Sequence, residues 1–333
     1  MVLSKPERLA FAELCNDSRQ SSSELARKLG ITRYNANKIL KNLESKYHIK
    51  YTMDLDYRAL GFAQMHVFYL NFDTTPKLSE LEKLLKNSTR IVFFATAKGD
   101  FDAIALAISR NSMEYSQIEV GFQASLIDYK TTFRSAALTG MRFGFMPLSN
   151  VQLRNAAIEE DYKKLLLELN ADSRIPAKEL ASKLGIDDNM INYYIKKMQQ
   201  NGIIKRFTAM VTDRVFPSTI VAFINYQVSN GIGARIERER HELYFSEDDE
   251  IEDFNHLNEM WSISGAAQAF IMASFSDLPS AEGFIKKHKE IYKPDNPSVK
   301  YAEIKDVIIG SIPFRKMNVR KEYDQTAWPT EIL

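Results

Sequence analysis

The chain of 333 residues contains a single cysteine, Cys15, and no apolar run near the length that crosses a bilayer. One cysteine excludes an internal disulfide framework and a zinc site built from several thiolates, and it is typical of a reducing compartment. The first residues show no apolar leader with a cleavage site. We therefore expect a cytoplasmic protein with no membrane partner.

Motifs for catalysis and for cofactor binding are also lacking. The five histidines form no pair three or four residues apart, so no zinc signature is present. Gly231 and Gly233 lack the third glycine of a dinucleotide fingerprint, and there is no phosphate-binding loop. The sequence thus predicts a protein that is not an enzyme, with no catalytic residues, no metal and no cofactor.

Neither sign of charge is in clear excess, since 44 Lys and Arg face 43 Asp and Glu. A polyanion would therefore be attracted only by a local basic surface. Residues 1–50 offer one, with ten Lys and Arg against five Asp and Glu.

The sequence repeats itself. Residues 17–31 and 172–186 align without a gap, and ten of the fifteen positions are identical, beginning with Asp-Ser-Arg in both segments. Gly99 and Gly265 belong to a second matching pair of segments, at a slightly larger offset than the first pair. The second copy therefore contains additional residues before Gly265, which we assign to the charged stretch 229–256. Such self-similarity indicates an internal duplication.

Each copy begins with a three-helix pattern. In the first copy a short second helix starts after Ser21, where Glu24 can complete a capping box, and it ends at Gly30, which suits a turn with positive φ. Thr32 is a good cap for the third helix. A short helix, a glycine turn and a longer helix followed by a β-segment are typical of a winged helix-turn-helix. The second copy has its corresponding signals at Pro176, Gly185 and Asp187.

The third helix is the part that would enter a DNA groove. Arg33, Asn37 and Lys41 recur every four residues, so they share one face, and their side chains can read base edges. Asp187 and Asp188 begin the corresponding helix of the second copy and would repel phosphates, so we expect that unit to bind more weakly or to read a different half-site. The candidate DNA-binding residues are Arg33, Tyr34, Asn35, Asn37, Lys38, Lys41, Asn189, Asn192, Tyr193, Lys196 and Lys197.

Each copy ends with the pattern strand, helix, two strands, helix and strand, which is the ferredoxin-like arrangement. In the first copy the predicted strands lie at 65–72, 91–97, 101–109 and from about 130, and the helices at 78–86 and 113–121. In the second copy the strands lie at 219–228, 256–263, 267–274 and 299–309, and the helices at 234–245 and 280–292. The acidic run 246–253 is interpreted as a solvated loop.

This order of motifs resembles the Lrp/AsnC (feast/famine) family of transcription regulators, here as two family units fused in tandem over about residues 6–146 and 160–313. The resemblance implies an α+β fold in which two winged helix-turn-helix domains alternate with two ferredoxin-like βαββαβ (RAM) domains. It predicts helix-turn-helix domains at 1–56 and 158–213, RAM-like domains at 62–147 and 218–313, and a C-terminal tail at 314–333.

The resemblance also implies partners. RAM domains in that family dimerise through their sheets and bind amino acids near a Gly-Asp-aromatic-Asp turn. It therefore implies a homo-oligomer through the RAM-like domains and the effector-binding residues Gly99, Asp100, Phe101 and Asp102, whereas the second copy lacks both carboxylates and the aromatic ring. Hairpin chemistry alone offers another interpretation, in which Asp100 only stabilises its own turn.

The sequence thus predicts a sequence-specific DNA-binding transcription regulator, with double-stranded DNA as partner and an amino acid or similar small molecule as candidate effector. One alternative is a tetrapyrrole-modifying enzyme, because the sirohaem decarboxylases resemble this family and use paired RAM units around a tetrapyrrole. His66, Arg134, Arg142 and His256 are the residues available for that role, although no spacing favours them. Another alternative is a protein-interaction scaffold on the same fold.

Overall fold

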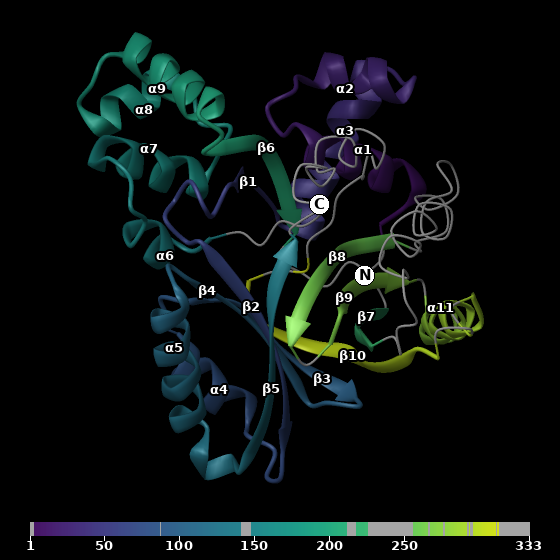
Figure 1. The fold of residues 1–333 in the computed structure, drawn as a ribbon. Helices are drawn as coiled ribbons and strands as arrows, with labels where there is room; N and C mark the ends of the chain where they lie inside the picture. Colours follow the sequence, from purple (N-terminus) through teal and green to yellow (C-terminus); the bar gives the residue numbers. More distant parts are fainter. Residues whose placement is uncertain are drawn as a thin grey trace, which may run out of the picture.

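The computed structural model describes residues 3–310 and 312, apart from 87, 141–147, 212–217, 226–255, 266, 276, 292, 294 and 295. Three predicted features lie outside the described residues: the helix at 234–245, the acidic run at 246–253 and the C-terminal tail at 314–333. The described chain is a mixed α+β structure, as expected (Figure 1).

The elements of the first half follow the predicted order, with ends shifted by a few residues. They are α1 (Lys5–Asn16), α2 (Ser22–Leu29), α3 (Arg33–Tyr47), β1 (Ile49–Leu55), β2 (Gln64–Phe72), α4 (Leu78–Leu85), β3 (Ile91–Gly99), β4 (Ala103–Ser109), α5 (Ser112–Ser125), a short 3-10 turn (Ile127–Tyr129) and β5 (Thr131–Gly140).

The second half begins with a short helix that the sequence pattern did not predict, α6 (Asn150–Arg154). Its other described elements are α7 (Glu160–Ala171), α8 (Ala177–Leu184), α9 (Asp188–Gln200), β6 (Ile204–Val211), β7 (Ser218–Asn225), β8 (His256–Gly265), β9 (Ala269–Phe275), α11 (Leu278–Ile291) and β10 (Ser298–Ile309).

Eight antiparallel strands close into one barrel in the order β10-β3-β4-β2-β5-β8-β9-β7, with β7 paired back to β10. Each half contributes four neighbouring strands, and in each set the first strand in sequence lies between the fourth and the third, as in a ferredoxin-like sheet. The two sets meet at two seams, where β3 pairs with β10 and β5 pairs with β8.

Alternation along the strands separates an inner from an outer face of the barrel. Tyr69 of β2 points inward and packs against Phe223 of β7, with ring centroids 4.8 Å apart, and Phe223 packs against Phe270 of β9 at 5.3 Å. Phe68, the neighbour of Tyr69, points outward and packs against Phe122 of α5 at 5.9 Å. The interior is therefore an aromatic core to which both halves contribute.

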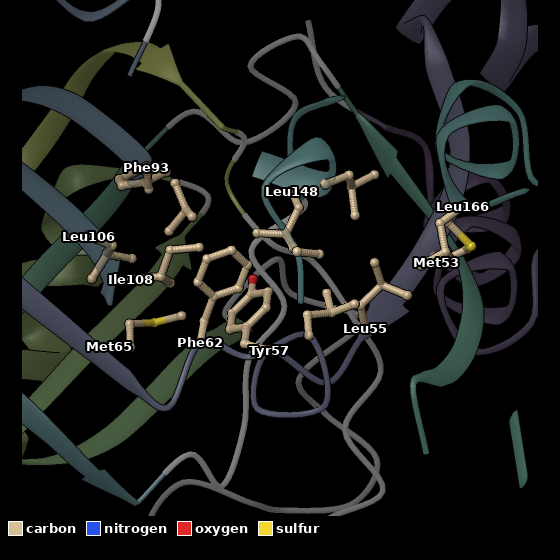
Figure 2. Packing of buried hydrophobic residues seen from close by; sticks show 14 of the residues in the cluster. Met53, Leu55, Tyr57, Phe62, Met65, Phe93, Leu106, Ile108, Leu148 and Leu166 are labelled. Atoms are coloured by element: carbon tan, nitrogen blue, oxygen red, sulfur yellow. The ribbon is translucent and has the colours of Figure 1, made fainter. Parts of the chain in front are cut away.

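The barrel core continues into the helices of the second half. Figure 2 shows the cluster running from Phe93 and Leu106 of the barrel, past Phe62, to Met53 of β1 beside Leu166 of α7. The helices of the first half have a cluster of their own. Among the described buried residues of that cluster, Ala209 of β6 is the member from the second half.

Strands β1 and β6 form a separate antiparallel ribbon, with Thr52 opposite Thr208. Each strand follows the third helix of its own half, as predicted, but their pairing with each other was not predicted. Helix α1 packs on β6, and α7 packs on β1. The ribbon therefore joins the two groups of helices that lie above the barrel in Figure 1.

Gly99 tests how tightly the β3–β10 seam is packed. A Cβ atom at this position would lie 2.5 Å from the Tyr301 carbonyl oxygen and 2.7 Å from the Cα of Ala302. Since both are backbone atoms, we predict that Gly99→Ala lowers the free energy of unfolding by about 3 kcal/mol in urea denaturation.

Gly121 of α5 provides the matched control, because a Cβ there meets nothing within 4 Å. Gly121→Ala should raise the free energy of unfolding by up to about 1 kcal/mol, since alanine favours a helix interior. Equal effects of the two substitutions would show that the seam is not close-packed.

Candidate nucleic-acid interface

The turn between α2 and α3 has the predicted geometry. The Glu24 carboxylate accepts a hydrogen bond from the Ser21 backbone N–H at 2.8 Å, and the Ser21 hydroxyl oxygen accepts one from the Glu24 N–H at 3.2 Å, which confirms the capping box. Gly30 ends α2 with a φ of +65°, and the Thr32 hydroxyl oxygen caps α3 at the Asn35 N–H, 3.2 Å away. These contacts fix the start and direction of α3.

Helix α3 is buried along one side and exposed along the other. Ala36, Leu40 and Leu43 are buried on the inner side. Within the described residues no ion pair neutralises Arg33 or Lys41 on the outer side, so this face is cationic. The predicted DNA-binding residues of α3 are all exposed: Arg33, Tyr34, Asn35, Asn37, Lys38 and Lys41.

Helix α9 presents a less basic surface. The Asp187 carboxylate caps the helix by accepting a backbone hydrogen bond at 2.8 Å, and Asp188 is exposed beside it. Lys197 Nζ lies 5.8 Å from the ring centroids of both Tyr162 and Tyr193, so its ammonium group makes cation–π contacts with both rings. The other candidates on α9 are exposed: Asn189, Asn192, Tyr193 and Lys196.

Two basic residues counted in the excess of residues 1–50 do not belong to the cationic face. Arg8 is only 7% exposed. Arg19 is half-buried against the second half, where its Nε donates a hydrogen bond to the Ser173 carbonyl oxygen at 2.6 Å. This role of Arg19 was not predicted, although the identical Asp-Ser-Arg in both copies was a signal for it.

The turn proposed for effector binding lies at the β3–β10 seam. The Asp100 carboxylate accepts a hydrogen bond from the Tyr301 N–H at 2.9 Å, and the Asp102 carboxylate accepts one from the Phe72 N–H at 2.8 Å. Phe101 is fully buried in the barrel core. The ammonium group of an amino acid would therefore compete with two backbone donors for these carboxylates.

Of the residues available for tetrapyrrole chemistry, two lie on opposite faces of the sheet. His66 points outward, where it is 5% exposed and its ring stacks on Tyr115 of α5 at a centroid distance of 3.6 Å. Arg134 of β5 stands opposite the inward-pointing Tyr69. Arg142 lies outside the described residues, and His256 begins β8. His66 and Arg134 therefore do not converge on one site.

Comparison with known proteins identifies the class of the helical unit in the second half. Residues 163–205, which run from α7 into β6, match the family described as winged helix-turn-helix DNA-binding. None of the described helices has the length and apolarity needed to cross a membrane.

Two relatives are transcription regulators by name. The chain is 33% identical over 69 residues to the HTH-type transcriptional regulator FL11 of Pyrococcus furiosus, a match that covers 21% of this chain and 46% of FL11. It is 26% identical over 137 residues to an uncharacterised HTH-type transcriptional regulator of Pyrococcus abyssi, which covers 41% of this chain and 83% of that protein. The chain thus spans about half the length of FL11.

The whole architecture also has a solved counterpart. The siroheme decarboxylase NirDL is similar in fold over 96% of this chain and 98% of its own, with a TM-score of 0.57 and 12% sequence identity. At that identity the likeness concerns the fold alone.

Burial of His66 has a consequence for pH dependence. Burial lowers the pKa of His66 from 6.5 to about 4, so between these values the unfolded chain binds a proton that the folded chain does not. The free energy of unfolding should therefore fall as the pH drops through this window, by at most about 1.4 kcal/mol per pH unit from this residue.

We predict that His66→Gln makes stability less dependent on pH, as measured by urea denaturation at pH 7 and pH 5. An NMR titration of the His66 ring gives a direct check. A ring that gains its proton near pH 6.5 in the folded protein would contradict the prediction.

Proposed function

We propose that the chain is a sequence-specific DNA-binding transcription regulator made of two Lrp/AsnC-like units in tandem. The observation that carries the proposal is the outer face of α3, where Arg33, Asn37 and Lys41 project together from a capped helix. A helix of this kind fits the major groove, where arginine pairs with guanine and asparagine with adenine. The winged helix-turn-helix match at 163–205 supports the same activity for the second unit.

The tandem arrangement is supported by the strand orders of the two half-barrels and by the Asp-Ser-Arg segments at 17–19 and 172–174. It divides the chain into helix-turn-helix domains at 1–56 and 158–213 and RAM-like domains at 62–147 and 218–313. Because the barrel closes within one chain, the sheet pairing through which RAM domains dimerise is met internally. The proposed homo-oligomer must therefore use other surfaces.

Effector binding at Gly99, Asp100, Phe101 and Asp102 stays a prediction. Calorimetric titration of the intact protein with each common amino acid tests it, and heat from one of them that disappears in Asp100→Asn would support this turn as the site. Absence of heat with every amino acid would refute it.

The proposal predicts unequal contributions from the two recognition helices. Lys41 lies on the cationic face of α3, whereas Lys196 shares α9 with Asp188. We predict that Lys41→Ala weakens binding to DNA selected from a random pool by about tenfold and lowers the slope of log affinity against log salt by about one. Lys196→Ala should weaken binding less.

Fluorescence anisotropy at several salt concentrations measures both effects. Lys164→Ala is the matched control, because Lys164 is an exposed lysine of α7 that lies away from both recognition helices along the sequence and pairs with Asp161 at 3.8 Å. If the control loses as much affinity as Lys41→Ala, the α3 face is not the interface.

The fold likeness to NirDL favours a tetrapyrrole-binding enzyme as the second candidate. Absorbance titration of the protein with an iron tetrapyrrole separates the two functions. A saturable shift of the Soret band together with no salt-sensitive DNA binding would favour the enzyme, and the converse result would favour the regulator. A protein that shows neither behaviour would point to the interaction scaffold.

A further inference from the structure

The loop between α1 and α2 contacts the loop between α7 and α8 through a reciprocal set of hydrogen bonds. Ser18 and Ser173 are fully buried, and their hydroxyl oxygens lie 3.0 Å apart. Arg19 Nε donates to the Ser173 carbonyl oxygen, and Arg174 Nε donates to the Ser18 carbonyl oxygen, each at 2.6 Å. Each loop is thus held by the other, and we call these four residues the interlock.

Both guanidinium groups also lie over aromatic rings of the β1–β6 ribbon. Arg19 Cζ is 3.9 Å from the ring centroid of Phe207 on β6, and Arg174 Cζ is 4.1 Å from that of Tyr51 on β1. Glu44 of α3 accepts a hydrogen bond from the Tyr51 hydroxyl at 2.6 Å and lies 3.7 Å from Arg174 Nη1. The planar fork of arginine serves both contacts at once, by donating at its edge and stacking with its face.

The Asp that precedes each Ser fixes the loop from within. The Asp17 carboxylate accepts a hydrogen bond from the Arg19 N–H at 2.9 Å, and the Asp172 carboxylate accepts one from the Arg174 N–H at 2.8 Å. All three residues of the repeated Asp-Ser-Arg segment therefore have a structural role at the same junction. None of them belongs to the outer face of α3 or α9.

The first helical unit depends on this junction because its apolar core is separate. That core receives Ala209 from β6, whereas the barrel core reaches α7, α8 and α9 without interruption. Further described ties of the first unit include the ribbon itself, a hydrogen bond from the Ser18 N–H to the Phe207 carbonyl oxygen at 3.1 Å, and contacts of α1 with β6. One of the latter is a hydrogen bond from the Thr208 hydroxyl to the Cys15 carbonyl oxygen at 2.7 Å. A two-stranded ribbon by itself is only marginally stable.

On the basis of the proposed DNA-binding function, we propose that the interlock sets the separation and orientation of α3 relative to α9, so that the chain selects two half-sites at one spacing. Arg19 and Arg174 act as positioning residues that do not touch DNA. Since each recognition helix must enter a groove, the half-site spacing on the duplex follows the distance between the helices in the protein.

The first test needs no DNA. Spin labels are placed by Ser23→Cys and Lys178→Cys, two exposed residues at matching positions of α2 and α8, while Cys15 is fully buried. Electron–electron double resonance should give a narrow distance distribution in the parent chain. The double variant Arg19→Lys, Arg174→Lys keeps both charges but loses the planar fork, and should broaden the distribution.

Arg58→Lys is the control, because Arg58 is an exposed arginine that pairs with Asp56 in the loop after β1. It should leave the distribution narrow. A distribution that stays narrow in the double variant, or that is broad in the parent chain, overturns the role of the interlock.

The second test measures spacing. A site selected by the parent chain is lengthened between its half-sites by about five base pairs, which is half a helical turn. The parent should lose at least about tenfold in affinity, and the double variant less than about threefold. Circular dichroism verifies that the double variant is folded, and the single variant Arg174→Lys gives an intermediate case.

Equal losses in parent and double variant overturn the proposal. A parent chain that binds no DNA refutes the proposed function instead, and the spin-label distances still decide whether the interlock holds the two units together.

Discussion

A four-stranded sheet that stands alone leaves a row of backbone N–H and C=O groups unpaired along each edge, and such edges invite pairing with any other strand. This chain pairs both edges of one sheet with both edges of another, at the β3–β10 and β5–β8 seams. That closure holds the two halves against each other along both sheet edges. Strands β1 and β6 also pair across the two halves, each along one edge, in the ribbon above the barrel.

Closure of the barrel does not attach the two helical units equally. The second unit shares its apolar core with the barrel, as Figure 2 shows from Phe93 to Leu166. The first unit, which carries the more basic recognition helix, is attached through a strand ribbon and polar contacts. The first unit, which we expect to bind DNA more tightly, is therefore the one whose attachment to the rest of the chain depends more on specific hydrogen bonds.

Local features of the structure were predictable from the sequence because the residues that cause them are close in the chain. The capping box of Ser21 and Glu24 spans three residues, and the turn at Gly30 requires one, so both follow from short-range rules. The strands of the barrel were predictable for the same reason, from runs of β-branched and aromatic residues. The helix α6 was missed because five residues are too few to show a helical period.

Contacts between the halves were not predictable in this way. From the sequence, Arg19 was counted as one more exposed basic residue. In the fold it bonds to Ser173, which is more than 150 residues away in the chain. Asp100 and Asp102 were predicted to bind an ammonium group. In the fold each carboxylate accepts a backbone hydrogen bond, Asp100 from Tyr301 in the other half and Asp102 from Phe72 in the same half. No local period or spacing encodes such pairs. For Arg19 and Ser173 the repeated Asp-Ser-Arg segments relate the two positions, whereas the repeat does not relate Asp100 to Tyr301.

The replacement of Arg33 by Asp188 between the corresponding helices has a geometric consequence. An assembly of identical subunits looks the same after a half-turn about its axis, so it can be laid on a duplex either way round with the same result. A single polypeptide whose halves have diverged has lost that equivalence. Its two halves are distinguishable, so it would bind a DNA duplex in one orientation, with one half upstream of the other.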